Sequence, residues 1–510
     1  MKNYLIKKGN HYCNDSIFEK LFWQLLKMKS AICLLIFLSL TAIGHAQNWS
    51  TPVTIFSNGN NLNLNCTVDN NGTIHCVWEH EISDNFRQIY YSNSVDEGAT
   101  WSTPVQISSN TRYWLSSPHI VADTLRNLYV SYDYNVGNVG QTMVYYKKYD
   151  ALTAVWSKQI LVSENMPGAN HNHLTIDNNN RLYFFWYYGA ENGHFFYRVL
   201  ENDQFGDIVD PYAWSQDTYF LVKAVADINN KLHCIGLHHG SNQTVYKERA
   251  VYFNCFNGEW SDYSELSTTP SWWKSDICLK NGGFPACTWN QIMNDDTVPI
   301  IDTFFSESED GSFPSPEYLG NTTYGYSEPS LVIDVNDNPH IVRTEKNDSS
   351  FQIVHFYKTG GGEWIKNIVD QGDLEFYGHC VLSKGSSLYW IYAKGLSYTT
   401  AGIDYRKLDI IPTVNEKSLS PDIKIAPNPF NEQFELTCNN ILSKHISIRI
   451  FDVYGRMVYK TSIDNIQNGQ LDFRWESANN KGNLLLPGIY VLQILDGTKV
   501  YCAKIIKIIS

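Results

Sequence analysis

Residues 64–80, LNCTVDNNGTIHCVWEH, contain two runs of alternating apolar and polar residues, separated by Asp69-Asn70-Asn71-Gly72. Alternation places one face of a strand inward and the other outward, and Asn and Gly tolerate the positive φ angles of a tight turn. The stretch therefore predicts a β-hairpin. Six further stretches repeat the pattern, and they begin at Pro118, Asn172, Val222, Ser275, Pro329 and Gly378.

The hairpins recur at a nearly fixed distance. Their first turn residues, which we use as register marks, are Asp69, Asp123, Asp177, Asp227, Lys280, Asp334 and Ser383. Successive marks lie 49 to 54 residues apart, and each hairpin except the last is followed by further strand-like segments. An all-β repeat of about fifty residues is typical of a β-propeller with four strands per blade. Seven repeats predict an all-β chain with a seven-bladed propeller.

The chain also indicates how the ring of blades closes. Residues 48–55, NWSTPVTI, repeat residues 100–107, TWSTPVQI, almost identically. The first copy precedes the first hairpin, whereas only one more strand, at 402–410, follows the last hairpin. We therefore expect the N-terminal strand to complete the last blade, which would leave no long free sheet edge.

One turn between strands carries a known motif. Residues 94–101, SVDEGATW, fit the form S-x-D-x-G-x-x-W through Ser94, Asp96, Gly98 and Trp101. This resembles the Asp-box of sialidase-like and BNR-repeat propellers, and the resemblance extends over residues 48–410. It implies a structural role for the four residues and does not by itself imply catalysis.

The first 46 residues are predicted to be removed. Met28-Lys29-Ser30, the apolar segment 31–43 and the small-residue site Gly44-His45-Ala46 have the form of a secretory signal peptide, with translation starting at Met28. No second long apolar run follows, so we expect no membrane span after cleavage. The net charge of −13 argues against nucleic acid as a partner. The propeller is expected to occupy residues 47–411.

A polar linker, residues 412–422, precedes a second small β-domain at 423–510, expected to be a β-sandwich. Its landmarks are PNPF at 427–430, DVYGR at 452–456 and LPGIYV at 486–491. These resemble the type A C-terminal sorting domain of the type IX secretion system of Bacteroidetes. The resemblance implies contact with the type IX secretion machinery and either attachment to the outer cell surface or release.

Candidate binding residues follow from the register marks. The residues four positions before the marks are all polar: Asn65, His119, His173, Lys223, Asp276, Ser330 and His379. The residues nine positions after them are mostly aromatic, but Arg343 breaks the series, which suggests a carboxylate or other anion facing it. We predict that ligand contacts at one mouth of the channel come from His119, His173, Lys223, Asp276, Arg343 and His379. The alternative is that these residues only line the channel.

Three functions remain open for this mouth. The simplest is binding of an extracellular glycan or a surface partner. The alternatives are an exo-sialidase-like glycoside hydrolase and a BNR-type polysaccharide lyase. For the lyase, the candidate active-site residues are His173, His194, Tyr246 and either Arg249 or Arg343. No arginine between 47 and 411 precedes Ile-Pro, as the sialidase motif requires, so no catalytic motif is complete.

Eleven cysteines occur, of which Cys13 and Cys33 lie in the segment expected to be removed. No CxxC or Cys/His cluster suggests a metal site, and no cofactor is predicted. Cys66 and Cys76, like Cys278 and Cys287, are expected on paired strands, where disulfides are often poor in geometry. Disulfides and buried thiols therefore both remain open.

Overall fold

The computed structural model describes the chain from residue 49 to 410 and from 423 to 508. Within these ranges it leaves out 84–85, 110–113, 136–140, 190–192, 216, 241–247, 294–299, 309–311, 326, 348–349, 360–361, 397–399, 439–444, 453–456, 465–470, 480–481 and 497–498. Every regular element in the described ranges is a β-strand. The contacts divide these residues into two compact units, one ending at Ile410 and one beginning after it. The predicted signal segment, the linker and Tyr246 lie outside the described residues.

The first unit contains seven antiparallel sheets in chain order. Sheet 1 comprises β2 (Asn60–Val68), β3 (Ile74–Ser83), β4 (Phe86–Ser94) and β5 (Val105–Gln106). Sheet 2 comprises β6 (Trp114–Ala122), β7 (Leu128–Asn135), β8 (Thr142–Asp150), β9 (Val155–Trp156) and β10 (Ile160–Leu161). Sheet 3 comprises β11 (Asn170–Ile176), β12 (Leu182–Tyr188), β13 (His194–Glu201) and β14 (Gln204–Val209).

The remaining four sheets follow the same plan. Sheet 4 comprises β15 (Thr218–Ala226), β16 (Leu232–His239), β17 (Arg249–Phe256), β18 (Glu259–Trp260) and β19 (Ser264–Glu265). Sheet 5 comprises β20 (Ser271–Leu279), β21 (Pro285–Ile292), β22 (Ile301–Glu307) and β23 (Glu317–Thr322). Sheet 6 comprises β24 (Ser330–Ile333), β25 (Pro339–Asn347), β26 (Ser350–Tyr357) and β27 (Ile365–Gly372). Sheet 7 comprises β28 (Glu375–Lys384), β29 (Ser387–Leu396), β30 (Thr400–Asp409) and β1 (Val53–Phe56).

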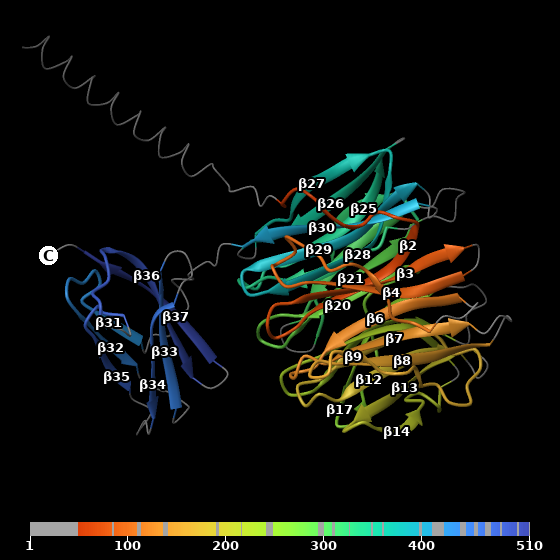
Figure 1. The fold of residues 1–510 in the computed structure, drawn as a ribbon, viewed down its shortest axis with the longest axis horizontal. Helices are drawn as coiled ribbons and strands as arrows, with labels where there is room; N and C mark the ends of the chain where they lie inside the picture. Colours follow the sequence, from red (N-terminus) through yellow and green to blue (C-terminus); the bar gives the residue numbers. More distant parts are fainter. Residues whose placement is uncertain are drawn as a thin grey trace, which may run out of the picture. The chain divides into compact units, whose positions relative to one another are not determined.

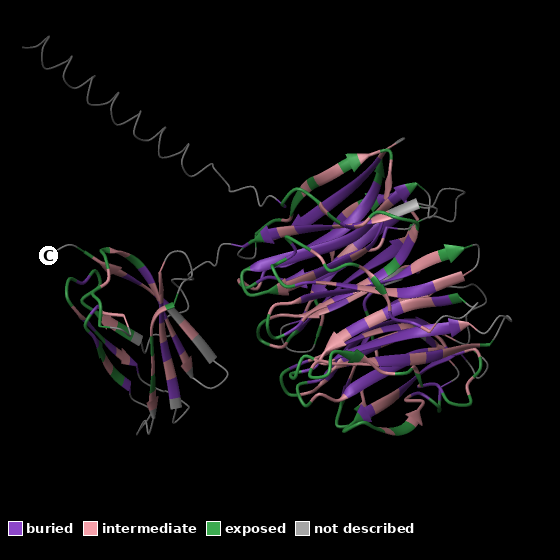
Figure 2. Ribbon diagram, in the orientation of Figure 1, coloured by how far each residue is buried: buried purple, intermediate pink, exposed green. Residues whose placement is uncertain are grey.

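The seven sheets, which Figure 1 shows from the side, are connected in a ring through their first strands. The first strand of each sheet contacts the first strand of the next, and β28 contacts β2. Seven separate clusters of buried apolar side chains lie in the seven seams between successive sheets. Figure 2 shows the buried residues along the strands and the exposed residues gathered at the turns. This is the arrangement of a β-propeller, in which each sheet packs its two faces against the two neighbouring sheets.

The turns that served as register marks have a common cause. Asp69 Oδ1 accepts hydrogen bonds from the backbone N–H groups of Asn71, at 2.9 Å, and Thr73, at 2.8 Å. Gly72 has a φ of 84°. The same pair of bonds recurs on Asp123, Asp177, Asp227 and Asp334. A short carboxylate that binds its own backbone stabilises the turn, so its position marks the same point in each of these hairpins.

The N-terminal strand completes the last sheet. β1 pairs with β30 through Val53 and Tyr405, and Thr54 and Asp404. Trp49 lies just before this strand, and its ring meets the ring of Trp390 edge to face, with 5.1 Å between centroids. The two ends of the ring are therefore joined by backbone pairing and by a buried aromatic contact.

The second unit has two sheets that share one apolar core. One sheet comprises β31 (Ile423–Ala426), β32 (Phe434–Cys438) and β35 (Leu471–Trp475). The other comprises β33 (His445–Asp452), β34 (Met457–Asp464), β36 (Gly488–Asp496) and β37 (Lys499–Lys507). Phe430 of the PNPF landmark is buried in this core, and Tyr490 of LPGIYV donates a 2.6 Å hydrogen bond to Leu486 O. Residues 453–456 of DVYGR lie outside the described residues.

Candidate functional site

The first strands are interrupted near their beginning. Six of the seven shift their pairing register there, and five positive-φ residues lie at the shifts: Asn63, Ser117, His171, Leu221 and Gly378. A bulge of this kind changes the direction in which the following side chains point. These bulges were not predicted, because four of the five residues are not glycine and the sequence pattern gives no other signal for a positive φ.

The polar residues four positions before the marks occupy equivalent places in six sheets. The pairs are Asn65 with Val77, His119 with Ser131, His173 with Phe185, Lys223 with Ile235, Asp276 with Thr288 and Ser330 with Val342.

In sheet 7 the register prediction is wrong by one residue. There the equivalent position is Cys380, which pairs with Ile391. Four residues separate the paired Ser383 and Leu388 of this hairpin, whereas five separate Val68 and Ile74 of the first. His379 therefore lies one residue earlier than the sequence pattern indicated.

The beginnings of the first strands enclose a cavity of about 260 Å³. All seven sheets, or the residues directly before their first strands, contribute to its lining. Five of the six candidate residues line it: His119, His173, Lys223, Asp276 and His379. Arg343 does not.

Two of the cavity histidines touch each other. The rings of His119 and His173 meet edge to face, with 4.9 Å between centroids. His119 Nδ1 lies 3.2 Å from Ser117 O, and His173 Nε2 lies 3.0 Å from Ala224 O. Burial lowers the pKa of His173 to about 4, and burial together with the charges of His173 and Lys223 holds the pKa of His119 well below its usual value. Both rings are therefore neutral at pH 7.

The tautomer of His173 follows from its partner. A carbonyl oxygen only accepts, so Nε2 carries the proton and Nδ1 carries a lone pair. Nδ1 is buried and has no hydrogen-bond partner among the described residues. Such a nitrogen can accept a hydrogen bond or a proton.

His379 is held from two sides. Its Nε2 lies 2.8 Å from Thr344 Oγ1, and Trp390 Nε1 donates to its Nδ1 at 3.3 Å. Burial lowers the pKa of His379 to about 4. Since both ring nitrogens are occupied, this side chain contributes shape to the cavity and leaves little capacity for proton transfer.

The cavity also contains an ion pair. Lys223 Nζ lies 3.2 Å from Asp276 Oδ1, and the side chain of Lys223 is 40% exposed. Asp276 Oδ2 accepts a 2.9 Å hydrogen bond from the backbone N–H of Leu331. Glu328 also lines the cavity. Among the described residues, the lining therefore contains one lysine and two acidic residues.

Several polar lining residues connect neighbouring sheets. Asn65 Oδ1 accepts from the backbone N–H of Ile120 at 3.0 Å, and Asp276 forms the corresponding bond to Leu331. Ser330, which lies outside the cavity lining, accepts from Val381 N–H at 3.2 Å. First strands of neighbouring sheets are not paired through their backbones, so side chains supply these bonds. The fold alone thus explains why some of the residues four positions before the marks are polar.

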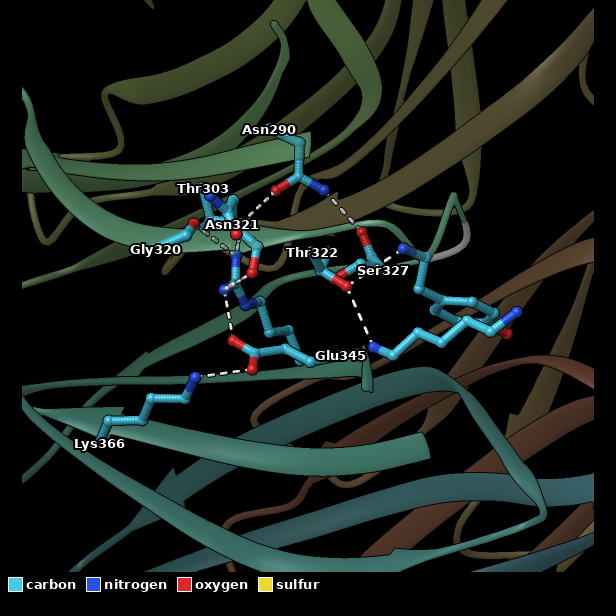
Figure 3. Close-up of polar contacts among 11 residues, drawn as sticks. Asn290, Thr303, Gly320, Asn321, Thr322, Ser327, Glu345 and Lys366 are labelled. Carbon is cyan, nitrogen blue, oxygen red and sulfur yellow. Dashed lines mark hydrogen bonds and ion pairs between the residues drawn. The ribbon is translucent and has the colours of Figure 1, made fainter. Parts of the chain in front are cut away.

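Arg343 lies between sheets 5 and 6 and is completely buried. Figure 3 shows residues around it, among them Thr303, Gly320 and Glu345, with Lys366 on the other side of Glu345. Its guanidinium donates to Glu345 Oε1 at 2.5 Å, to Gly320 O at 3.2 Å and to Thr303 Oγ1. Glu345 also accepts from Lys366 Nζ at 2.6 Å. The facing carboxylate that the sequence suggested is therefore Glu345 of the same strand. The position nine residues after each mark, which is aromatic in most sheets, packs into the seam between two sheets. Arg343 occupies this position in sheet 6 and is therefore buried.

Two acidic residues, Glu79 and Asp133, directly follow the aromatic residues Trp78 and Tyr132, and they have a role that the sequence did not reveal. Glu79 Oε1 accepts from the backbone N–H of Ser117 at 2.8 Å, and Asp133 Oδ2 accepts from that of His171 at 2.9 Å. Each carboxylate thus holds the bulge of the next sheet. Burial raises the pKa of Asp133 to about 7 and also raises the pKa of Glu79, whose other oxygen meets Arg87.

The turn at 94–101 is closed by its own side chains. Ser94 Oγ donates to Asp96 Oδ1 at 2.8 Å and accepts from Gly98 N–H at 2.8 Å. Asp96 also accepts from the hydroxyl and the backbone N–H of Thr100, at 2.6 and 2.9 Å. The bonds from Thr100 and Ser94 lower the pKa of Asp96 to about 2.

This turn packs against the last sheet. Gly98 has a φ of 87°, and a Cβ there would lie 2.1 Å from the ring of Tyr405, so no other residue fits. The hydroxyl of Tyr405 donates to Glu97 O at 2.5 Å, and its ring meets Trp101 edge to face. The turn therefore meets sheet 7 through Gly98 and Trp101, whereas Ser94 and Asp96 bond within the turn.

The histidine and arginine proposed for a lyase are not assembled in the cavity. His194 Nδ1 lies 2.7 Å from Asp210 Oδ2, and Arg249 Nη1 donates to Thr268 O at 2.6 Å. Neither residue lines the cavity, although His173 does.

Among the described residues, no three His, Cys, Asp or Glu side chains come close enough together to hold a metal ion. The same part of the chain contains no helix that could cross a membrane.

The first unit resembles solved structures of glycan-active enzymes. A polysaccharide lyase of family PL25, an ulvan lyase, has a TM-score of 0.52 at 12% identity, covering 70% of this chain and 96% of that one. An ulvan lyase structure bound to -[GlcA(1-4)Rha3S]- gives 0.51 at 13% identity, with 70% and 96% covered. An α-L-arabinanase of Penicillium chrysogenum with arabinobiose gives 0.44 at 14% identity, with 71% and 98% covered. At these identities the likeness to the ulvan lyases shows the fold alone.

No curated protein sequence matches this chain. Residues 424–508 match the family model described as the secretion system C-terminal sorting domain. The match covers nearly all of the second unit and includes the PNPF and LPGIYV landmarks. The chain thus carries a type IX secretion sorting domain at residues 424–508, and it is exported to the cell surface or the extracellular space.

Proposed function

We propose that residues 47–411 form a seven-bladed β-propeller that binds a glycan outside the cell through the cavity at the beginning of its first strands. The observation that carries the proposal is the lining of this cavity, where six sheets and Glu328, just before the sixth, place polar groups around about 260 Å³. Amide, imidazole, carboxylate and ammonium groups supply the donors and acceptors that sugar hydroxyls require.

The charge of the cavity indicates the kind of sugar. Among the described lining residues Lys223 is the only lysine or arginine, and it is paired with Asp276, while Glu328 is a second acidic residue of the lining. An anionic sugar would therefore find no lysine or arginine of the described lining without a carboxylate partner. We infer that the ligand is a neutral glycan, recognised through its hydroxyl groups.

A glycan array with turnover assays in parallel tests this function. We expect binding to neutral glycans, no release from a sialoside reporter and no rise in absorbance near 230 nm on uronate polysaccharides. Sialoside hydrolysis would instead identify a sialidase, and the absorbance rise would identify a lyase. A folded protein that is inert in all three assays would refute glycan recognition and leave a surface protein as the partner.

Eliminative cleavage of a uronate polysaccharide is the second candidate. It is favoured by His173 Nδ1, a buried nitrogen with no hydrogen-bond partner among the described residues, on a ring that meets His119, and by the fold of the ulvan lyases. Such a base would need a cation to neutralise the uronate carboxylate, and only Lys223 is in place. Its pairing with Asp276 makes this the weaker candidate.

The remaining assignments concern the mature protein. We propose a signal peptide that ends at Ala46, a linker at 412–422 and a β-sandwich sorting domain at 423–510. The two sheets and the shared core of the second unit support the last of these. We also propose that residues 94–101 are a true Asp-box with a structural role, supported by the closed hydrogen-bond pattern of the turn.

A further inference from the structure

The seam between sheet 7 and sheet 1 is where the ring closes, and it contains three cysteines. Cys66 lies on β2, Cys76 pairs directly with it on β3, and Cys380 lies on β28. All three belong to the single apolar cluster that joins these two sheets. No other seam cluster contains three cysteines.

Cys66 and Cys380 approach each other from opposite sides of this seam. Cys380 Sγ lies 3.9 Å from Cys66 O. Burial raises the pKa of the Cys66 thiol, and hydrogen bonding to the Cys380 thiol and then to the Cys76 thiol raises it further. Cys66 and Cys380 therefore contact each other across the seam between the first and last sheets.

The register explains why Cys380 points this way. Cys380 takes the place in sheet 7 that His173 has in sheet 3, and His173 reaches the backbone oxygen of Ala224 in the next sheet. Cys380 reaches the equivalent oxygen, that of Cys66, in sheet 1. The shortened hairpin of sheet 7 thus replaces a polar ring residue with a thiol at the closure.

We propose that Cys66 and Cys380 are joined by a disulfide in the exported protein, so that the first and last sheets of the ring are covalently linked. The outside of the cell permits disulfides, whereas the structure has both residues as thiols. Cys66 and Cys76 are the competing pair, but they lie opposite each other within one regular sheet, where the required dihedral angles are often strained.

The oxidation is a thiol–disulfide exchange with a dithiol–disulfide carrier. The thiolate of one cysteine attacks the carrier disulfide, which gives a mixed disulfide and releases one carrier thiol. The thiolate of the other cysteine attacks the mixed disulfide and releases the second carrier thiol. Two electrons and two protons pass to the carrier, and one S–S bond forms. Because burial disfavours the thiolate in the folded seam, the bond forms before the seam closes.

Alkylation mapping of protein collected from the medium or the cell surface of the producing cells tests this. The protein is denatured and treated with N-ethylmaleimide without reductant, then digested. We expect the Cys66 and Cys380 peptides to be linked and Cys76 to be alkylated, with an intact mass lower by two hydrogen atoms. Alkylation of all three cysteines, or a link between Cys66 and Cys76, would overturn the proposal.

Urea unfolding gives an independent readout. A reductant should lower the unfolding midpoint of the native protein, because it removes a cross-link over most of the ring. Cys380→Ser should lack this response, and the matched control Cys278→Ser, in another seam, should keep it. A native midpoint that does not change with reductant would refute the covalent closure, and this result does not depend on either variant folding.

Discussion

Replacing Arg343 with Met separates a structural role from a role in binding. The guanidinium is completely buried and contacts Glu345, Thr303 and Gly320 O, as well as lying 5.1 Å from the centroid of the Phe356 ring. Methionine fills much of the volume but leaves Glu345 Oε1 and the two oxygens of Thr303 and Gly320 without this donor. Breaking a buried pair in this way costs about 3–5 kcal/mol.

This cost converts into a measurable shift. A unit of about 360 residues unfolds with an entropy of roughly 0.8 kcal/mol/K, so the expected fall in Tm is about 4–6 °C. Differential scanning calorimetry of Arg343→Met against the parent protein measures it. The double variant R343M/E345Q should lose less, because it leaves no charged carboxylate that has lost its buried guanidinium partner, and Lys366, which is 44% exposed, can be hydrated instead.

Two results would refute this reasoning. A fall in Tm below about 1 °C would mean that the buried pair stabilises nothing, because it corresponds to less than about 1 kcal/mol. Loss of glycan binding at unchanged Tm would mean that Arg343 acts on the ligand, although it does not line the cavity.

Three further outcomes are expected. Deleting residues 47–57 removes β1 and should lower Tm sharply, and an unchanged Tm would contradict closure by β1. The pKa values of His173 and His379 are lowered to about 4 in the folded state, so between pH 6.5 and 4 the unfolded chain binds more protons than the folded one. The free energy of unfolding should therefore decrease as the pH is lowered through this range. His173→Gln should reduce the slope of urea stability against pH, and an unchanged slope would contradict the lowered pKa. Intact-mass measurement should find residues 423–510 absent from the mature protein, whereas retention of Ser510 would contradict removal of the sorting domain.

Much of the fold could be predicted because its determinants are local. Asp69 and its counterparts bind their own backbone, so the same residue type marks the same place in successive hairpins. The repeated WSTPV segment identified the closing strand for the same reason, since a segment that forms the outer strand of one sheet does so in another. Neither inference required knowledge of distant contacts.

The site was predicted less well, because its determinants are not local. The count from Ser383 missed Cys380, since one residue fewer in a turn moves the register of the strand before it. The alternating sequence pattern predicted that Arg343 lies near the end of its strand. It could not show that the side chain at this position packs against the neighbouring sheet. The bulge at Ser117 depends on Glu79 of the previous sheet, a contact 38 residues away in the chain.

Glycan binding through the cavity is tested most directly by titration calorimetry of Lys223→Gln against the glycan found on the array. Lys148→Gln is the matched control, because Lys148 also forms an exposed ion pair, with Asp203 at 2.9 Å, but lies on β8 outside the cavity lining. We expect Lys223→Gln to weaken binding about tenfold, or about 1.4 kcal/mol, and Lys148→Gln to leave it unchanged. Equal affinities of both variants and the parent protein would contradict binding in the cavity.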